Sequence, residues 1–100
     1  MRLKKNEIVA ITDVTHSVFG KDASVRLFGS RINDSLKGGD IDLLIQCNHT
    51  LSSSEQYMLK INFLVQLKKI IGDQRIDVLI ESNQQDSPFI QTIKQEGVNL

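Results

Sequence analysis

Three aspartates are residues whose type and spacing could bind a metal ion. Asp40 and Asp42 are separated by one residue in the segment DIDLLI, and Asp77 lies among aliphatic residues in the similar segment RIDVLI. Alternate residues of a strand point to the same side, so Asp40 and Asp42 are predicted to share one face. Like charges on one face repel each other unless a cation lies between them, and Mg²⁺ prefers carboxylate, water and phosphate oxygens. The pattern predicts a magnesium site made of Asp40, Asp42 and Asp77.

Each of these aspartates also has an ordinary structural interpretation. A lone D-x-D pattern is most often a pair of polar residues on the wet face of a strand. Asp77 joins the other two only if its strand pairs in a register that the sequence does not determine, and it remains open as a buried partner of Arg75 or Arg31. As a metal ligand, Asp77 could in addition accept or steer the proton of an acceptor hydroxyl.

A glycine and a serine precede the paired aspartates at the end of another strand-like run. Residues 24–28 alternate and suit a pleated sheet, and Gly29 and Ser30 follow directly. If a helical turn begins there, its free backbone N–H groups form an anion site, which a glycine allows a phosphate to approach. The Ser30 hydroxyl and Arg31 would add a donor and a charge. An isolated Gly-Ser is usually an ordinary turn, but its place before the aspartates predicts that Gly29, Ser30 and Arg31 bind a nucleotide.

The hydrophobic pattern predicts the elements that position these residues. Helices and strands are expected in the order α-β-β-α-β-α, which gives an α/β or α+β fold with a small sheet and helices packed on it. The expected ranges are a helix at 6–19 capped by Asn6 and ended by Gly20, strands at 24–28, 40–45 and 75–80, a helical turn and loop at 31–39, a helix from the Ser52 cap to Ile71, and a helix from the Ser87 cap to Gly97.

The longest of these helices is predicted to cover the core. Ser52 and Glu55 match a capping box at its start. Its apolar residues follow a seven-residue rhythm, which we interpret as the face toward the sheet. The residues of this stripe are Tyr57, Met58, Ile61, Leu64, Val65, Lys68 and Ile71.

Length and composition limit the classes of protein. One hundred residues suit a single domain over residues 1–100, since domains most often have roughly 100–150 residues. The 12 basic and 12 acidic side chains cancel, which argues against direct nucleic-acid binding on electrostatic grounds. The lone Cys47 cannot form an internal disulfide, and no apolar stretch approaches the roughly 20 residues that cross a bilayer, so we expect a cytoplasmic protein.

The combination of motifs resembles the nucleotidyltransferase superfamily that includes DNA polymerase beta and kanamycin nucleotidyltransferase. Its pattern is G-S, about ten residues, D-x-D and then a third acidic residue in a strand, and the string FGSRINDSLKGGDIDLLI followed by RIDVLI matches it in order. The chain looks most like the minimal nucleotidyltransferases of prokaryotes, whose E-G-x-x-L-like tail corresponds to residues 96–100. The matching residues are Gly29, Ser30, Asp40, Asp42 and Asp77.

This resemblance implies a fold and an activity. The fold would be that of nucleotidyltransferases, with a small mixed sheet of three or four strands. The substrate would be ATP or another nucleoside triphosphate, with Mg²⁺ as cofactor. Many minimal nucleotidyltransferases are antitoxins of helical HEPN ribonuclease toxins and transfer AMP from ATP to a tyrosine of the toxin.

Other functions remain open at this stage. The protein could neutralise a partner by contact alone with an idle nucleotide site, or it could modify a small molecule. A nucleic-acid-directed transferase is disfavoured by the neutral charge and the few aromatic residues. The sequence does not determine whether the domain works in a homo-oligomer or a hetero-oligomer.

Overall fold

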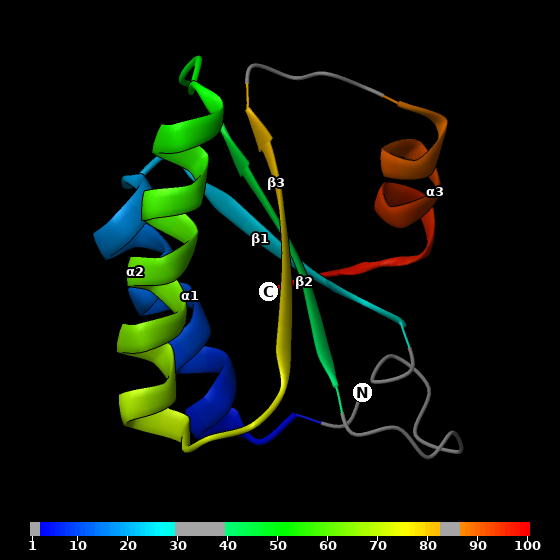
Figure 1. Ribbon diagram of the computed structural model, residues 1–100. Helices are drawn as coiled ribbons and strands as arrows, with labels where there is room; N and C mark the ends of the chain where they lie inside the picture. Colours follow the sequence, from blue (N-terminus) through cyan, green and yellow to red (C-terminus); the bar gives the residue numbers. More distant parts are fainter. Residues whose placement is uncertain (1–2, 30–39, 83–86) are drawn as a thin grey trace.

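Helices and strands follow one another in the predicted order along the part of the chain that the structure describes. This computed structural model describes residues 3–29, 40–82 and 87–100 (Figure 1). The predicted α-β-β-α-β-α order is confirmed, and a two-residue strand follows the last helix. The elements are α1 (Lys5–Phe19), β1 (Ser24–Phe28), β2 (Ile41–Cys47), α2 (Ser53–Ile71), β3 (Ile76–Ser82), α3 (Pro88–Glu96) and β4 (Val98–Asn99).

The strands form one mixed sheet in the order β3-β2-β1-β4. β1 pairs antiparallel with both β2 and β4, whereas β2 and β3 run parallel. Parallel neighbours need a long crossover connection, and α2 supplies it between β2 and β3. This crossover brings the two segments that carry aspartates side by side.

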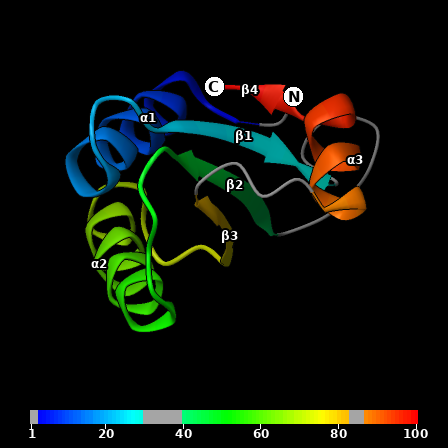
Figure 2. The same ribbon diagram turned by 90° about the horizontal axis from the view of Figure 1, so that it is seen from above.

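One face of the sheet holds the main core. α1 and α2 cover this face, while α3 lies on the other side of the sheet (Figure 2). Alternate residues of the strands are buried under the two helices, where the rings of Phe19 and Phe63 meet with centroids 5.9 Å apart. The buried strand residues of this cluster are Val25, Leu27, Ile41, Leu43, Ile45, Cys47, Ile76 and Val78. The intervening residues therefore point to the opposite face.

The predicted helix ends at Gly20, Ser52, Ile71, Ser87 and Gly97 are confirmed, and the predicted start at Asn6 is wrong. Glu55 donates its backbone N–H to the Ser52 hydroxyl at 3.2 Å, and Ser52 donates its own N–H to the Glu55 carboxylate at 3.1 Å. Gly20 ends α1 at φ +110°. The cap of α1 is Lys4, not Asn6, because the Glu7 carboxylate accepts the Lys4 backbone N–H at 2.9 Å and so starts the helix earlier.

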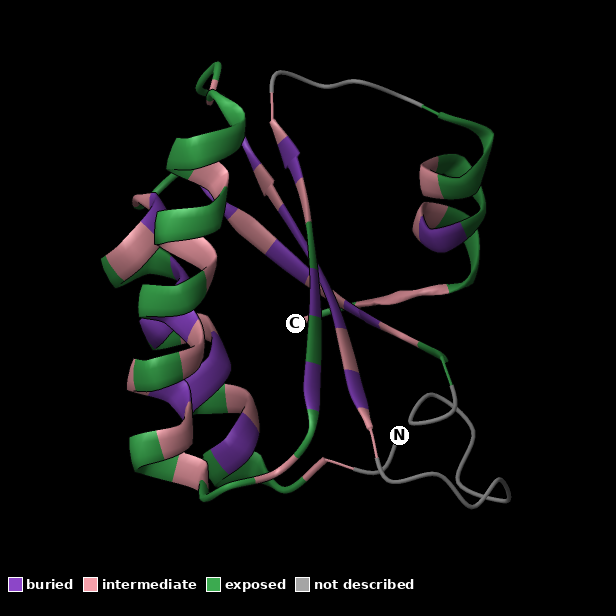
Figure 3. Cartoon of the chain, viewed as in Figure 1, coloured by how far each residue is buried: buried purple, intermediate pink, exposed green. Residues whose placement is uncertain are grey.

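The predicted core stripe of α2 is wrong for most of its residues, although Leu64 and Ile71 do pack against the core. Phe63 and Leu67 are the buried residues of this helix, whereas Tyr57 and Met58 are 65% and 66% exposed and Val65 is 50% exposed. α2 carries apolar residues on two sides, and periodicity alone cannot tell which side meets the sheet. Figure 3 shows that the outward surface of α2 is largely exposed. No helix in the described ranges is long and apolar enough to span a membrane.

Candidate functional site

Asp42 and Asp77 are register partners on the parallel strands β2 and β3. Their neighbours Ile41 and Ile76 are buried in the main core, so both aspartates point to the opposite face of the sheet. Asp42 is half-buried and Asp77 is exposed. The register that the prediction required is therefore confirmed, and two carboxylates lie next to each other on an accessible surface.

The carboxylates of Asp42 and Asp77 repel each other, which favours a proton on one of them or a cation beside both. Desolvation raises the pKa of Asp42 above its ordinary value of 3.8, and the charges of Asp77 and Asp40 raise this pKa further, together with a side-chain hydrogen bond to Asp77. A hydrogen bond between two carboxyl groups requires a proton on one of them. A cation placed between them would remove the same repulsion without protonation.

Asp40 precedes β2, and its charge acts on Asp42, but its carboxylate pairs with Arg75. Its Oδ1 atom lies 3.7 Å from Nε of Arg75 in an ion pair that is largely open to solvent. The alternative that Asp77 is a buried partner of Arg75 is thus wrong, because Asp77 is exposed and Arg75 pairs with Asp40. Within residues 3–29, 40–82 and 87–100, no three Asp, Glu, His or Cys side chains are grouped closely enough to hold a metal ion. The structure brings two of the three predicted carboxylates together and leaves the third at the margin.

Gly29 lies directly against the carboxylate of Asp42. Phe28, the last residue of β1, is the register partner of Asp42, and Gly29 follows it with φ +80°. A Cβ atom on Gly29 would collide with Oδ2 of Asp42 and lie 3.1 Å from its Cγ. Only glycine therefore fits here without a shift of either residue. The other predicted phosphate-binding residues, Ser30 and Arg31, and the expected turn and loop at 31–39 lie outside the described residues.

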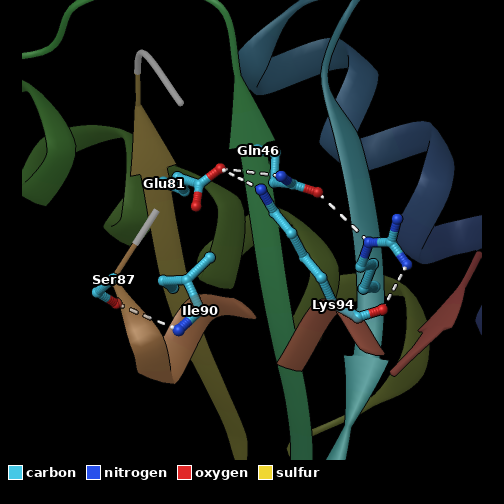
Figure 4. A network of polar contacts seen from close by, with 6 residues as sticks. Gln46, Glu81, Ser87, Ile90 and Lys94 are labelled. Carbon is cyan, nitrogen blue, oxygen red and sulfur yellow. Dashed lines mark hydrogen bonds and ion pairs between the residues drawn. The ribbon is translucent and has the colours of Figure 1, made fainter. Parts of the chain in front are cut away.

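A buried polar network closes the other end of the same face (Figure 4). Glu81 is 4% exposed, and its Oε1 atom accepts from Nε2 of Gln46 at 2.9 Å and lies 3.2 Å from Nζ of Lys94 on α3. Arg26 donates to the Gln46 side chain at 3.4 Å and to the Lys94 carbonyl at 3.4 Å. Among the described residues, Oε2 of Glu81 has no hydrogen-bond partner. The network attaches α3 to the sheet, and α3 covers this end of the face.

The sequence prediction missed Glu81 and Lys94. Glu81 lies four residues after Asp77, and Gln46 lies four residues after Asp42, so the alternation of each strand already places them on the same face. Lys94 has no comparable sequence signal, because its partner lies on another element. The face therefore has a carboxylate pair and a glycine at one end and a helix held by an ion pair at the other.

The carboxylate pair and the adjacent glycine suit the binding of a cation. Paired carboxylates supply oxygen atoms for a hard cation, and the glycine beside them lets the end of β1 approach the Asp42 carboxylate closely. The chain matches the family described as Polymerase beta, Nucleotidyltransferase over residues 16–100, and it belongs to this family. The matched region includes Gly29, Asp42 and Asp77. No curated protein gives a match. The nucleotidyltransferase fold, with its mixed four-stranded sheet, is thus established.

Proposed function

We propose that this nucleotidyltransferase transfers AMP from ATP to a hydroxyl group of a partner protein and depends on Mg²⁺. The partner would be a HEPN ribonuclease toxin that is modified on a tyrosine, and the protein would act as its antitoxin. Family membership supports nucleotidyl transfer in general. The resemblance to minimal nucleotidyltransferases supports the acceptor and the antitoxin role. The observation that carries the proposal is the register pair Asp42 and Asp77 with Gly29 against Asp42.

The described residues fit a divalent cation at this pair. Asp42 and Asp77 would hold it through carboxylate oxygens. The pKa of Asp42 is raised first by burial and then by repulsion from Asp77 and Asp40, and a cation would relieve this repulsion. Asp40 would join them if it exchanged its solvent-exposed pair with Arg75 for the cation, a change that costs little because exposed ion pairs contribute about 0–1 kcal/mol. Bound there, Mg²⁺ would offset the negative charge of the triphosphate during transfer.

Residues of the chain would position the nucleotide and the acceptor hydroxyl for one displacement at the α-phosphorus. If the predicted turn follows Gly29, its backbone N–H groups would bind the triphosphate, with Ser30 and Arg31 adding a hydroxyl donor and a positive charge. The acceptor hydroxyl oxygen would form a bond to the α-phosphorus while the bond to pyrophosphate breaks, and the hydroxyl proton would pass to Asp77 or to water. Asp77 suits this role because it is the more accessible carboxylate of the pair.

The test is transfer of label from ATP carrying a radioactive α-phosphate, with Mg²⁺ and the product of the neighbouring gene as acceptor. Asp42→Asn and Asp77→Asn should each lower the transfer rate by more than about 100-fold, since loss of even an outer-shell partner of a metal costs about 10–100-fold. Asp13→Asn, an exposed aspartate of α1, is the matched control and should leave the rate unchanged. Full activity of Asp42→Asn would contradict the proposed site.

One observation favours a second candidate function, an antitoxin that neutralises its partner by contact alone. Asp40 pairs with Arg75, and the described residues contain no group of three metal ligands, so the site as it stands is a carboxylate pair. In this case the protein would bind its partner tightly without labelling it, and Asp42→Asn would bind equally well. Label on a small-molecule acceptor, and none on protein, would identify a third kind of nucleotidyltransferase.

A further inference from the structure

The exposed side of α2 carries a continuous apolar stripe. Met58, Ile61 and Val65 are exposed, and Tyr57 adjoins them at the N-terminal half of the helix. At about 100° per residue these side chains fall within an arc of roughly 100°, nearly opposite the buried Phe63. Figure 3 shows this side of α2 on the outside of the molecule, away from the sheet. The stripe is therefore separate from both the core and the carboxylate pair.

Charged residues flank the stripe at its two ends with opposite sign. Glu55 lies in the first turn of α2, and Lys69 lies in the last turn. Both are exposed, and the helical rotation places both on the same side of the stripe, within about 60° of Met58. If two copies of α2 met antiparallel, Glu55 of each copy would come opposite Lys69 of the other copy.

The charged residues and the apolar residues of the stripe call for twofold axes at nearly the same point of α2. An axis beside Asn62 pairs Glu55 with Lys69 of the second copy, because Asn62 lies midway between them in the sequence. An axis half a residue away, between Ile61 and Asn62, sets Met58 against Val65 of the second copy. Such an interface is isologous, which means that each contact occurs twice. The agreement of the two axes favours a second copy of this chain over an unrelated partner.

We infer that the exposed stripe of α2 mediates an antiparallel homodimer, with Met58, Ile61 and Val65 at its centre and Glu55–Lys69 pairs at its ends. A helix of 19 residues is about 28 Å long and about 10 Å wide, so this face offers on the order of 300 Å² per copy. Stable interfaces bury about 800 Å² per partner. The homodimer is therefore weak and depends on protein concentration.

Sedimentation velocity of the full chain tests the inference between about 5 µM and about 500 µM protein. The wild type should shift from monomer to dimer over this range. Ile61→Glu should stay monomeric, whereas Ile70→Glu should dimerise as the wild type does. Ile70 is the matched control, since it is an exposed apolar residue of the same helix that lies outside the stripe. A wild type that stays monomeric at every concentration, or a dimer that survives Ile61→Glu, would overturn the inference.

The antiparallel orientation of the two α2 helices is tested separately, through the charged residues at the ends of the stripe. Glu55→Lys and Lys69→Glu should each raise the dimer dissociation constant about tenfold, because each places like charges opposite each other twice. A mixture of the two variants should restore association, since both end pairs of the heterodimer then join opposite charges. Thermal unfolding of each variant checks that α2 remains folded after the change at its cap. A mixture no tighter than the separate variants would exclude the antiparallel arrangement.

Discussion

Asp42 of β2 and Asp77 of β3 occupy the same register position on parallel neighbouring strands and point to the face of the sheet opposite α1 and α2. Folding brings these two like charges together, and the pKa of Asp42 rises as a result of burial and of its acidic neighbours. Like charges directly opposite each other destabilise a sheet. The protein tolerates this cost at the position where we propose that a nucleotide and a cation bind.

Asp42→Asn is expected to stabilise the protein when metal ions are removed with a chelator. The raised pKa of Asp42 means that the folded state binds a proton more tightly than the unfolded state, so stability falls as the pH rises above the ordinary value of 3.8. The variant should gain about 0.5 kcal/mol at pH 7 and lose this advantage below pH of about 4. Urea denaturation at both pH values measures the difference. A variant that is less stable than the wild type at pH 7 would contradict this account.

Gly29→Ala is expected to cost more stability than Gly20→Ala. Both glycines have positive φ, at +80° and +110°, so alanine is strained by about 1–3 kcal/mol at either position. A Cβ atom on Gly20 meets nothing within 4 Å, whereas one on Gly29 collides with the carboxylate of Asp42. Overpacking should add about 1–2 kcal/mol to the loss for Gly29→Ala. Chemical denaturation compares the two variants, and equal losses would show that Gly29 does not press on Asp42 in solution.

Lys94→Met is expected to destabilise the attachment of α3 to the sheet. The Glu81 side chain is 1% exposed, so removal of the Lys94 ammonium leaves a buried carboxylate without its cation. Loss of one partner of a buried pair costs about 3–5 kcal/mol, and the partial exposure of Lys94 reduces the expected loss to about 2 kcal/mol. Glu81→Gln in the same chain should recover much of it. Denaturation of the single and double variants measures this coupling, with the exposed Lys5→Met as control.

Ser52→Ala is expected to weaken the start of α2 by about 1 kcal/mol, the usual loss when a capping hydroxyl is removed. The pKa of Glu55 is lowered first by the Ser52 backbone N–H and then by the Ser52 side chain. The ionised Glu55 therefore favours the folded state above its ordinary pKa of 4.5, and this contribution disappears as the pH falls through the lowered value. Thermal melts of Ser52→Ala and of the neighbouring Ser53→Ala should differ at pH 7. Equal melting temperatures would show that the cap is not formed.

Local patterns were sufficient for most elements and for part of the site. The alternation of residues 41–47 and 76–82 defines strands whatever they pair with, because successive side chains of a strand point to opposite faces. The Ser52 cap and the helix end at Gly20 depend on contacts with residues only a few positions away, so they can also be predicted from the sequence. The motif from Gly29 to Asp42, followed by Asp77, was enough to indicate the nucleotidyltransferase family.

Contacts between distant segments were decided only by the tertiary structure. The pairing of Asp42 with Asp77 depends on the register of two strands that are joined by a 19-residue helix. The pairing of Arg75 with Asp40 also requires these two strands to lie side by side. Which apolar side of α2 meets the sheet is likewise a property of packing, since both sides have helical periodicity. The residues able to bind a metal ion or a phosphate could be recognised from the sequence, because side-chain type and local periodicity are properties of short segments. Only the folded chain determined which of these residues meet, because register and packing depend on the whole sheet at once.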